Sequence, residues 1–527
     1  MRKIYLLLLA LLPVAAFSQE RIMVIADPHV LASSLMEDGE ALGTMMASQR
    51  KMIDLSETAW LAAMDTALKY KPALVLIPGD LTKDSEVASH EVVINQLRRL
   101  HEAGIKTLVI PGNHDIGGKA YAYKGAEKTE VESMPDEGWE IAYDWIYKDA
   151  VSKDTDSHSF ASEPLDGLTV LGIDGSHGSE GIGSLSAQTL EWVLAQADAA
   201  AEKGNMIIAM THWQLLDDFD KKSMMESACR MKDADALRDS LLHHHVHLVL
   251  TGHFHVNAIS TYRDTLSTSM DSIVEISTGS LVTFPCPYRW LTISENREEV
   301  TVESAALTAI GNIPDLRTYS REWMRAHTAN MIPEMTLRVW RRADEALALI
   351  RENPKYGGEA LAAILEQSMP KTDEERVALV ERNLGNTVVE LYLLYSEANE
   401  PGHPEADSLA QEVYAGLDKL IHEMTDATMG NIFFRSMQDF LITTAKTVAK
   451  EPVQSLVEDK TDWKSAFFAD RTDDLQVRLR INARAREALD QIDSQENDGA
   501  VYDMLGRRYN GGLPHGVYIQ NGQKIVR

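Results

Sequence analysis

The sequence predicts an α/β domain, followed by an all-α helical region and a short β-hairpin tail. Three observations support this prediction. Short apolar runs alternate with helical segments up to about residue 300, helical periodicity dominates from about 316 to 494, and Asn521-Gly522 separates two short β-prone runs near the end of the chain. With 527 residues, the chain is long enough for about three or four domains and a large core.

Five of the apolar runs predict strands that are buried on both faces. Each run is continuous and rich in Val, Ile and Leu, and amphipathic helical segments lie between the runs. One such segment places Val93, Leu97 and Leu100 on one stripe and ends before Gly104. The five runs span residues 22–26, 73–77, 107–110, 206–210 and 246–250.

Composition limits the classes of function. Asp and Glu number 80 and Lys and Arg number 51, so the net charge is −29 and general binding of nucleic acids is disfavoured. An anionic substrate would then need metal ions to hold it. The two cysteines, Cys229 and Cys286, are too few for a Cys-rich zinc module or a disulfide framework, and the sequence leaves open whether they pair.

The first 18 residues are typical of a secretory signal peptide. Arg2-Lys3 precede an apolar run over 4–12, and the small residues Ala16 and Ser18 favour cleavage after Ser18. The run is shorter than the roughly 20 residues that cross a membrane, so we expect no transmembrane segment. The prediction is an exported protein that is periplasmic, bound to the cell surface or secreted.

Polar residues of the kinds that bind metals directly follow all five predicted strands. The carboxyl ends of strands are where α/β sheets place their ligands, and Gly79, Gly112 and Gly252 allow the backbone to approach closely there. Carboxylate, imidazole and carboxamide groups suit Zn, Mn or Fe, and the set exceeds what one ion needs, so we expect two adjacent ions. The residues are Asp27, His29, Asp80, Asn113, His114, Asp115, His212, His253 and His255.

In order and spacing, these residues resemble the signature of the calcineurin-like metallophosphoesterases. The resemblance covers about residues 20 to 300 and implies a four-layer α/β/β/α sandwich. Lys83 stands where purple acid phosphatases carry a tyrosine ligand, which disfavours that subclass. Three segments look most like the bacterial branch that includes cyclic-nucleotide phosphodiesterases, namely 79–82, 159–164 and 277–281.

The resemblance also implies a role for each residue. His114 would be an acid or transition-state stabiliser outside the ligand set, and Asp115 would orient it through the other ring nitrogen. A hydroxide bridging the ions would attack the phosphorus, because two cations lower the pKa of a shared water and neutralise the phosphate oxygens. Asp80 would bridge the two ions, the first of which would also bind Asp27, His29 and His255, and the second Asn113, His212 and His253.

Other histidines have structural explanations that compete with a functional one. The run His243 to His247 lies at a helix-to-strand junction without carboxylate spacing, which favours solvated or hydrogen-bonded side chains. His177 follows the predicted strand 168–173 at its carboxyl end, where it would be within reach of substrate. A structural role in the loop is nevertheless the favoured interpretation of His177.

The predicted domain boundaries divide the mature chain into three parts. The α/β domain covers 19–310, the helical domain 311–495 and the β-rich tail 496–527, after the signal peptide 1–18. Residues 372–375 have the form of a capping box, as expected at the start of a helix. One helical stripe comprises Leu409, Val413, Leu417, Leu420 and Met424.

The C-terminal tail suggests a partner. It resembles the end of the C-terminal sorting tail carried by cargo of the bacterial type nine secretion system, so secretion or cell-surface machinery is an expected partner. The alternative is a terminal hairpin that only packs and stabilises.

We therefore expect a metal-dependent phosphoric ester hydrolase with a small phosphate ester as substrate and phosphodiesters favoured. A nucleotidase-like phosphomonoesterase is the alternative within the same chemistry, because both use the same metal centre. An alternative of another class is a surface-anchored binding protein whose phosphoesterase domain is idle. The intact ligand set argues against idleness.

Overall fold

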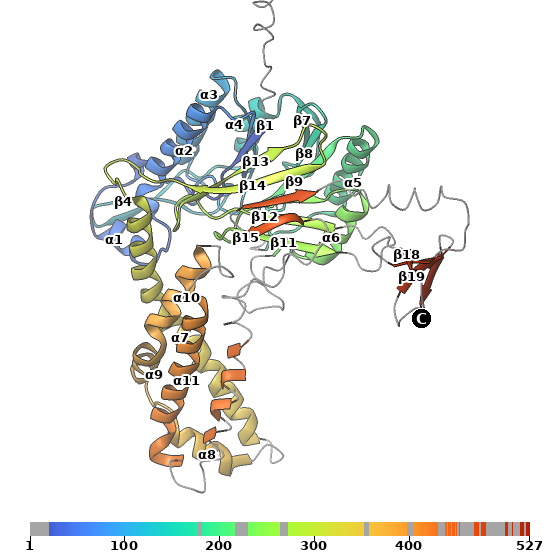
Figure 1. Ribbon diagram of the computed structural model, residues 1–527. Coiled ribbons are helices and arrows are strands. Elements are labelled where there is room, and N and C mark those ends of the chain that lie inside the picture. Colours follow the sequence, from blue (N-terminus) through green and yellow to red (C-terminus); the bar gives the residue numbers. More distant parts are fainter. Residues whose placement is uncertain are drawn as a thin grey trace, which may run out of the picture.

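The computed structural model consists of a domain with two large β-sheets, a column of helices and a small sheet near the C-terminus (Figure 1). The predicted signal peptide and Cys229 lie outside the described residues. Cys286 is buried and, within the described part of the chain, forms no disulfide. The structure describes residues 20–177, 182–216, 230–263, 272–352, 358–397 and 405–429, and separate short stretches from 438 to 526.

The first sheet holds three of the five predicted strands. Its seven strands lie in the order β15-β16-β14-β13-β1-β2-β3. Strands β1, β2 and β3 are parallel, and Leu76 of β2 lies between Val24 of β1 and Leu108 of β3. The strands are β1 (Glu20–Val24), β2 (Leu74–Pro78), β3 (Lys106–Ile110), β13 (Pro287–Ile293), β14 (Glu299–Ala306), β15 (Phe468–Asp473) and β16 (Gln476–Arg480).

The second sheet holds the other two. Its order is β11-β12-β10-β9-β8-β7-β6, and β8, β9, β10 and β12 are parallel. Ile208 of β9 lies between Val170 of β8 and Leu248 of β10. All five predicted strands are thus confirmed. The bounds are β6 (Ala150–Lys153), β7 (Phe160–Leu165), β8 (Leu168–Ile173), β9 (Met206–Thr211), β10 (Leu248–Thr251), β11 (Ala258–Arg263) and β12 (Ser272–Ser277).

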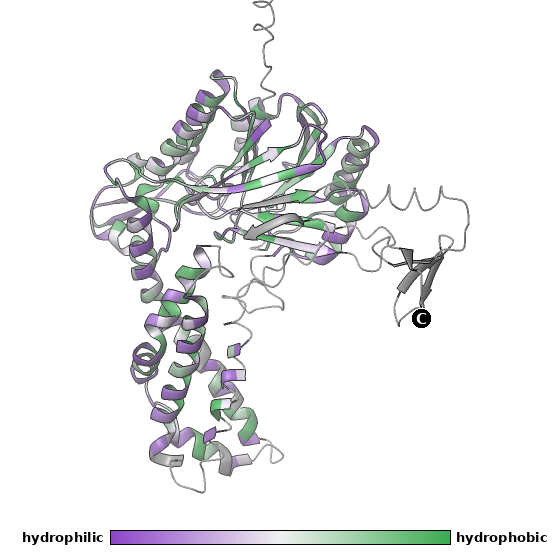
Figure 2. Cartoon of the chain, in the orientation of Figure 1, coloured by the Kyte–Doolittle hydropathy of each residue, from purple (hydrophilic) through white to green (hydrophobic). Residues whose placement is uncertain are grey.

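Hydrophobic residues are frequent along both sheets and the flanking helices (Figure 2), and their buried side chains form the core. Leu76 and Ile208, from different sheets, belong to one buried cluster together with Trp60 of α2 and Leu97 of α3. Another buried cluster joins the second sheet to α5 and α6. Because the sheets share a core, their strand ends are held in a fixed relation. The helices are α1 (Glu40–Ala47), α2 (Ser56–Tyr70), α3 (Val87–Glu102), α4 (Asp136–Tyr147), α5 (Ala187–Glu202) and α6 (Ala234–His243), and β4 (Ala120–Lys124) with β5 (Glu127–Val131) forms a hairpin.

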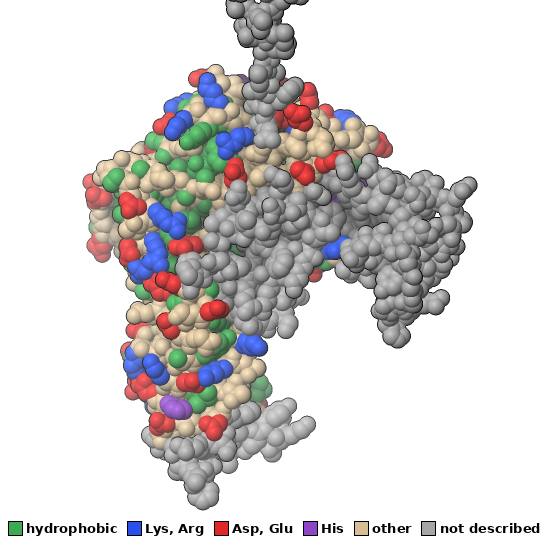
Figure 3. All heavy atoms as spheres, viewed as in Figure 1, with side chains coloured by type: hydrophobic (Ala, Val, Ile, Leu, Met, Phe, Trp, Pro, Cys, Tyr) green, Lys and Arg blue, Asp and Glu red, His purple; other side chains and the backbone are tan. Residues whose placement is uncertain are grey.

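The helical region forms its own core. The predicted stripe of α11 is buried or partly buried in one cluster, and Thr372 and Glu375 form the predicted capping box at the start of α9. On the face that Figure 3 shows, acidic and basic side chains are interspersed over these helices. No described helix has the length and apolar character needed to cross a bilayer. The helices are α7 (Leu316–Glu352), α8 (Gly358–Ser368), α9 (Asp373–Val380), α10 (Asn386–Ser396) and α11 (Ala406–Met429), with a π-helical turn, η4 (Glu381–Gly385), before α10.

Two strands, β15 and β16, lie inside the range 311–495 that was predicted as a helical domain. Strand β16 pairs antiparallel with β14 and β15 pairs with β16, so the chain returns from the helices to the edge of the first sheet. This pairing was not predicted, because the sequence of β16 does not indicate which distant strand it pairs with.

Helix α10 packs against loops that lead to the strand ends of the α/β domain. Val256, which adjoins His255, shares a buried cluster with Tyr395. The guanidinium group of Arg50 donates a hydrogen bond to the hydroxyl of Tyr392, and its Cζ lies 4.9 Å from the centre of that ring. The helical region therefore supports two loops of the α/β domain.

The tail contains the predicted hairpin. Strands β19 (Val517–Gln520) and β20 (Gln523–Val526) pair antiparallel, with Gln520 opposite Gln523, and the predicted turn residues Asn521 and Gly522 lie outside the described residues. Strands β17 (Val501–Asp503) and β18 (Arg508–Tyr509) complete a four-stranded sheet.

A buried histidine joins α3 to α4 and to the loop after β3. The backbone carbonyl of Asp115 accepts a hydrogen bond from Nε2 of His90 at 2.8 Å, so Nδ1 accepts from the Tyr143 hydroxyl, also at 2.8 Å. These partners stabilise the neutral ring. Burial lowers the pKa of His90 from 6.5 to about 4.

The protonation of His90 makes stability depend on pH. Below pH 6.5, His90 is protonated in the unfolded chain but stays neutral in the folded one until the pH approaches 4. The free energy of unfolding therefore falls by about 2 kcal/mol between neutral pH and pH 5 because of His90. His90→Gln removes this loss. We expect the gap in melting temperature between wild type and variant to narrow as pH falls from 7 to 5; a gap that is constant with pH would contradict the assignment.

Candidate dinuclear metal centre

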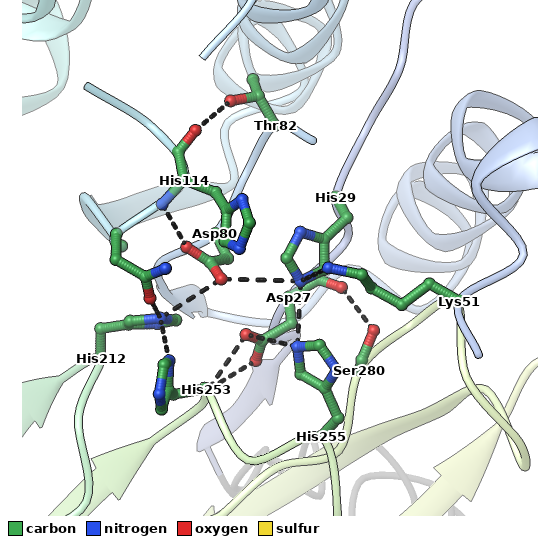
Figure 4. A network of polar contacts seen from close by, with 12 residues as sticks. Asp27, His29, Lys51, Asp80, Thr82, His114, His212, His253, His255 and Ser280 are labelled. Carbon is green, nitrogen blue, oxygen red and sulfur yellow. Dashed lines mark hydrogen bonds and ion pairs between the residues drawn. The ribbon is translucent and has the colours of Figure 1, made fainter. Parts of the chain in front are cut away.

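The predicted ligands converge at the carboxyl ends of strands from both sheets (Figure 4). In the first sheet, the ligands lie in the loops after β1, β2 and β3; in the second sheet, they lie in the loops after β9 and β10. By distance, the ligands form two groups, and the ligand atoms within each group lie within 4.8 Å of one another. The first group comprises Asp27, His29, Asp80 and His255, and the second comprises Asp80, His212 and His253.

The first group has its nitrogen and oxygen atoms turned inward. Nε2 of His255 lies 2.9 Å from Nε2 of His29 and 3.3 Å from Oδ1 of Asp27. The two rings are nearly perpendicular, at 77°, with their centres 4.9 Å apart. Two facing nitrogens cannot both present lone pairs without repulsion, and a shared cation relieves it.

The second group is arranged in the same way. Nε2 of His212 lies 3.1 Å from Nδ1 of His253 and 3.0 Å from Oδ1 of Asn113. The other nitrogen of His212, Nδ1, donates to the carbonyl of Pro78 at 2.8 Å, so Nε2 is the nitrogen that faces the centre and that an ion could bind in place of a proton. Asn113 thus joins this group with a carboxamide oxygen.

Asp80 belongs to both groups. Its Oδ1 accepts a hydrogen bond from the backbone N–H of His114 at 2.9 Å. Its Oδ2 lies 3.5 Å from Nε2 of His29 and 3.4 Å from Nε2 of His212. One carboxylate oxygen therefore lies close to both sets, a position from which a carboxylate can bridge two ions.

The backbone at these positions is unusual. Five of the predicted ligands are non-glycine residues with φ between +42° and +64°, a left-handed conformation that costs about 1–3 kcal/mol each and is concentrated at functional sites. Strand-end turns of this kind direct side chains inward over the sheet edge. The five are Asp27, His29, Asp80, His253 and His255.

Two glycines allow the carboxylates to sit against the backbone. A Cβ on Gly252 would lie 2.4 Å from Oδ2 of Asp27, and one on Gly112 would lie 2.2 Å from Oδ1 of Asp80. Both distances are far below van der Waals contact, so any side chain there would displace a predicted ligand.

The electrostatics favour bound cations. Burial lowers the pKa values of His29, His253 and His255 well below the usual range, so these rings are neutral and have lone pairs to offer. Burial raises the pKa of Asp27 to about 8, which shows how strongly this site resists an uncompensated negative charge. The donor set fits Zn, Mn or Fe, and the role of each residue as a ligand remains a prediction.

The predicted contact between Asp115 and the ring of His114 is wrong. The carboxylate of Asp115 instead accepts from the backbone N–H groups of Leu81, Thr82 and Gly112, and so ties the loop after β2 to the loop after β3. Burial makes such a carboxylate costly unless backbone donors surround it, and three donors do. Asp115 thus fixes the loops that carry Asp80 and Asn113.

Asp84 occupies the position expected of Asp115. Its Oδ1 lies 2.9 Å from Nδ1 of His114, and the ring of His114 stands 5.0 Å from that of His29. Burial opposes protonation of His114, but the carboxylates of Asp80 and Asp84 outweigh it and raise the pKa of His114 above the usual value. Asp84 was not predicted from the sequence, although its position in the loop directly after Asp80 could have indicated it.

Lys51 is a second functional candidate that the sequence did not reveal. It lies between α1 and the 3₁₀ turn η2 (Ile53–Leu55), and its Nζ is 3.5 Å from Nε2 of His29 (Figure 4). Burial lowers the pKa of Lys51. Lys51 follows neither a predicted strand nor a glycine turn, so the sequence around it does not indicate a functional role. Only the path of its loop brings it to the centre.

Histidines outside the centre divide into two kinds. In the run from 243 to 247, Nδ1 of His243 bonds to the carbonyl of Asp239 and Nδ1 of His244 lies 2.8 Å from Oδ1 of Asp198, in agreement with the predicted structural role. His177 belongs to a separate cluster with His158 and Asp136.

Residues 20–257 match the family model described as calcineurin-like phosphoesterase. No curated protein sequence matches the chain. Among solved structures, a dimetal phosphatase from Danio rerio is 14% identical with a TM-score of 0.38, and the match covers 56% of this chain and 98% of that one. A phosphopantetheinyl hydrolase from Mycobacterium tuberculosis is 12% identical with a TM-score of 0.21, covering 50% and 90%.

The range matched by the family model includes every predicted ligand, together with His114, Asp84 and Lys51. The match indicates a metal-dependent phosphoester hydrolase. The part of the chain from residue 20 to residue 257 is therefore similar to the calcineurin-like phosphoesterases.

Proposed function

We propose that this protein hydrolyses phosphodiesters at a centre of two metal ions. The observation that carries the proposal is the position of Asp80, whose Oδ2 lies between Nε2 of His29 and Nε2 of His212 at 3.5 and 3.4 Å. When bound, the ions would supply a nucleophile at neutral pH and neutralise charge on the phosphate. Zn, Mn or Fe would suit the donors.

The side chains around the centre supply the remaining steps. His114, kept protonated by its carboxylate neighbours, would give a proton to the leaving oxygen, and Asp84 would hold the ring in the orientation for this transfer. The ammonium group of Lys51 would bind a phosphate oxygen at the same edge of the centre. Asp115 would act indirectly by holding the loops.

Charge favours a diester over a monoester. A phosphomonoester carries nearly two negative charges at neutral pH, whereas a diester carries one. The chain has a net charge of −29, and Asp84 adds a partly exposed carboxylate beside the centre, so the more highly charged substrate is disfavoured. A phosphomonoesterase is the alternative with the same centre, and an idle domain in a surface-bound binding protein is the alternative of another class.

Hydrolysis of two chromogenic substrates tests the proposal. With Mn, Zn or Fe added, we expect faster turnover of bis-(p-nitrophenyl) phosphate than of p-nitrophenyl phosphate, and a loss of at least about 10²-fold in Asp80→Ala. Asp65→Asn, which changes an exposed carboxylate of α2, is the control and should retain activity. No turnover with any metal, or full turnover in Asp80→Ala, would refute the enzymatic role.

A double-mutant cycle tests the pairing of His114 with Asp84. We expect kcat to fall about 10²- to 10⁴-fold in His114→Ala and about 10- to 100-fold in Asp84→Asn. The double variant should be no slower than His114→Ala, because Asp84 acts through the ring. Both losses should grow as the leaving group becomes a poorer one than p-nitrophenolate; additive effects, or losses independent of the leaving group, would contradict the assignment.

We also propose that the protein is exported and that its tail takes part in sorting. The charged, apolar and small-residue segments of 1–18 and the resemblance of the tail to type nine sorting tails support this proposal. The four-stranded sheet of β17–β20 gives the tail a folded form that a receptor could recognise.

Truncation before Val501 tests the sorting role. We expect the truncated chain to accumulate in the periplasm, whereas the full chain reaches the cell surface or the medium, because the element that the machinery recognises is gone. Fractionation of cells followed by immunoblotting measures this, with total protein as the control for stability. Identical distribution of both chains would reject the sorting role and favour a stabilising hairpin.

A further inference from the structure

A second cluster of metal-binding side chains lies outside the dinuclear centre. It brings together Asp136 at the start of α4, His158 in the turn before β7 and His177 in the loop after β8. Three different segments of the chain therefore meet at one point. None of the three residues belongs to the signature on which the dinuclear centre rests.

The three ligand atoms are close to one another. Oδ1 of Asp136 lies 2.9 Å from Nε2 of His158 and 3.1 Å from Nδ1 of His177. The two rings are 5.5 Å apart and nearly perpendicular, at 84°, which resembles the arrangement of the paired rings in the dinuclear centre. Two imidazoles and one carboxylate are a common donor set for zinc, and three protein ligands leave a position for water.

Buried neighbours fix the two histidines. The carboxylate of Asp174, which is 1% exposed, accepts from the backbone N–H of His158 at 3.2 Å and of His177 at 3.0 Å. The side chain of His158 is 5% exposed and its ring lies 6.1 Å from that of the buried Trp139. The segments that present the two nitrogens are therefore preorganised, as a metal site requires.

The cluster is also connected to the dinuclear centre. Ser176, which precedes His177, accepts a hydrogen bond from Nε1 of Trp213 at 3.0 Å. The ring of Trp213 lies 4.0 Å from the ring of His253, a predicted ligand of the second ion. One tryptophan side chain therefore links the loop that carries His177 to a predicted ligand of the dinuclear centre.

We propose that Asp136, His158 and His177 form a third cation site that binds a divalent ion of the zinc class. The site is independent of the proposed hydrolysis, because none of its ligands is shared with the dinuclear centre. It leaves one side open to solvent, since the side chains of Asp136 and His177 are 49% and 37% exposed. The ion therefore can exchange with the medium without unfolding of the chain.

Counting bound metal tests the third site. The full chain is stripped with a chelator, equilibrated with Zn²⁺ by dialysis and analysed by mass spectrometry of the elements. We expect about three equivalents in the wild type and about two in His177→Ala and Asp136→Asn. Both substituted side chains are partly exposed, so the variants should fold, which circular dichroism checks.

His244→Ala is the matched control. Its ring also pairs with a carboxylate, that of Asp198, at 2.8 Å. Among the described residues, however, His244 and Asp198 have no third metal-binding side chain beside them, so this variant should keep about three equivalents of zinc. Equal zinc content in wild type and His177→Ala would overturn the third site. A wild type with about one equivalent, lost in His177→Ala, would support the third site and count against the dinuclear centre.

Discussion

The carboxylate of Asp80 is the constraint on which the rest of the site depends. One oxygen is held by the backbone N–H of His114, so the other must face both His29 and His212. His29 follows a strand of the first sheet and His212 follows a strand of the second, and both predicted ion sites draw ligands from both sheets. The centre therefore forms only if the strand ends of the two sheets lie next to each other, and the apolar core that the sheets share holds them there.

The same dependence explains why strain is tolerated at the ligands. Five left-handed residues cost about 1–3 kcal/mol each, which is much of the net stability of a typical domain. Compensation comes from contacts around them: Asp115 satisfies three backbone N–H groups of the loops after β2 and β3, and α10 packs Tyr395 against Val256 beside His255. The helical region, which carries no motif of its own, thereby supports the loop of a predicted ligand.

The sequence predicted the strands and the ligand positions because both follow from local rules. A buried parallel strand appears in the sequence as a short apolar run. Residues that directly follow such a run lie at the carboxyl ends of the strands, which is where α/β sheets bind their ligands. Asp84 and Lys51 obey no such rule, since their side chains reach the centre through the course of loops. The assignment of Asp115 failed for a related reason: adjacency to His114 in sequence says nothing about which way a buried carboxylate points. The return of β16 to β14 depends on a distant partner and was equally hidden.

Charge links the composition of the chain to its chemistry. With 80 acidic and 51 basic residues, the long-range field repels anionic substrates, so attraction must arise locally. The centre concentrates the neutral imidazoles of His29, His253 and His255 together with buried carboxyl groups, and Lys51 stands beside it. Burial strengthens the attraction between such carboxylates and a metal cation, because it removes the screening by water. An acidic surface and an anionic substrate are therefore compatible, provided that the positive charge is carried by ions that the acidic field itself helps to retain.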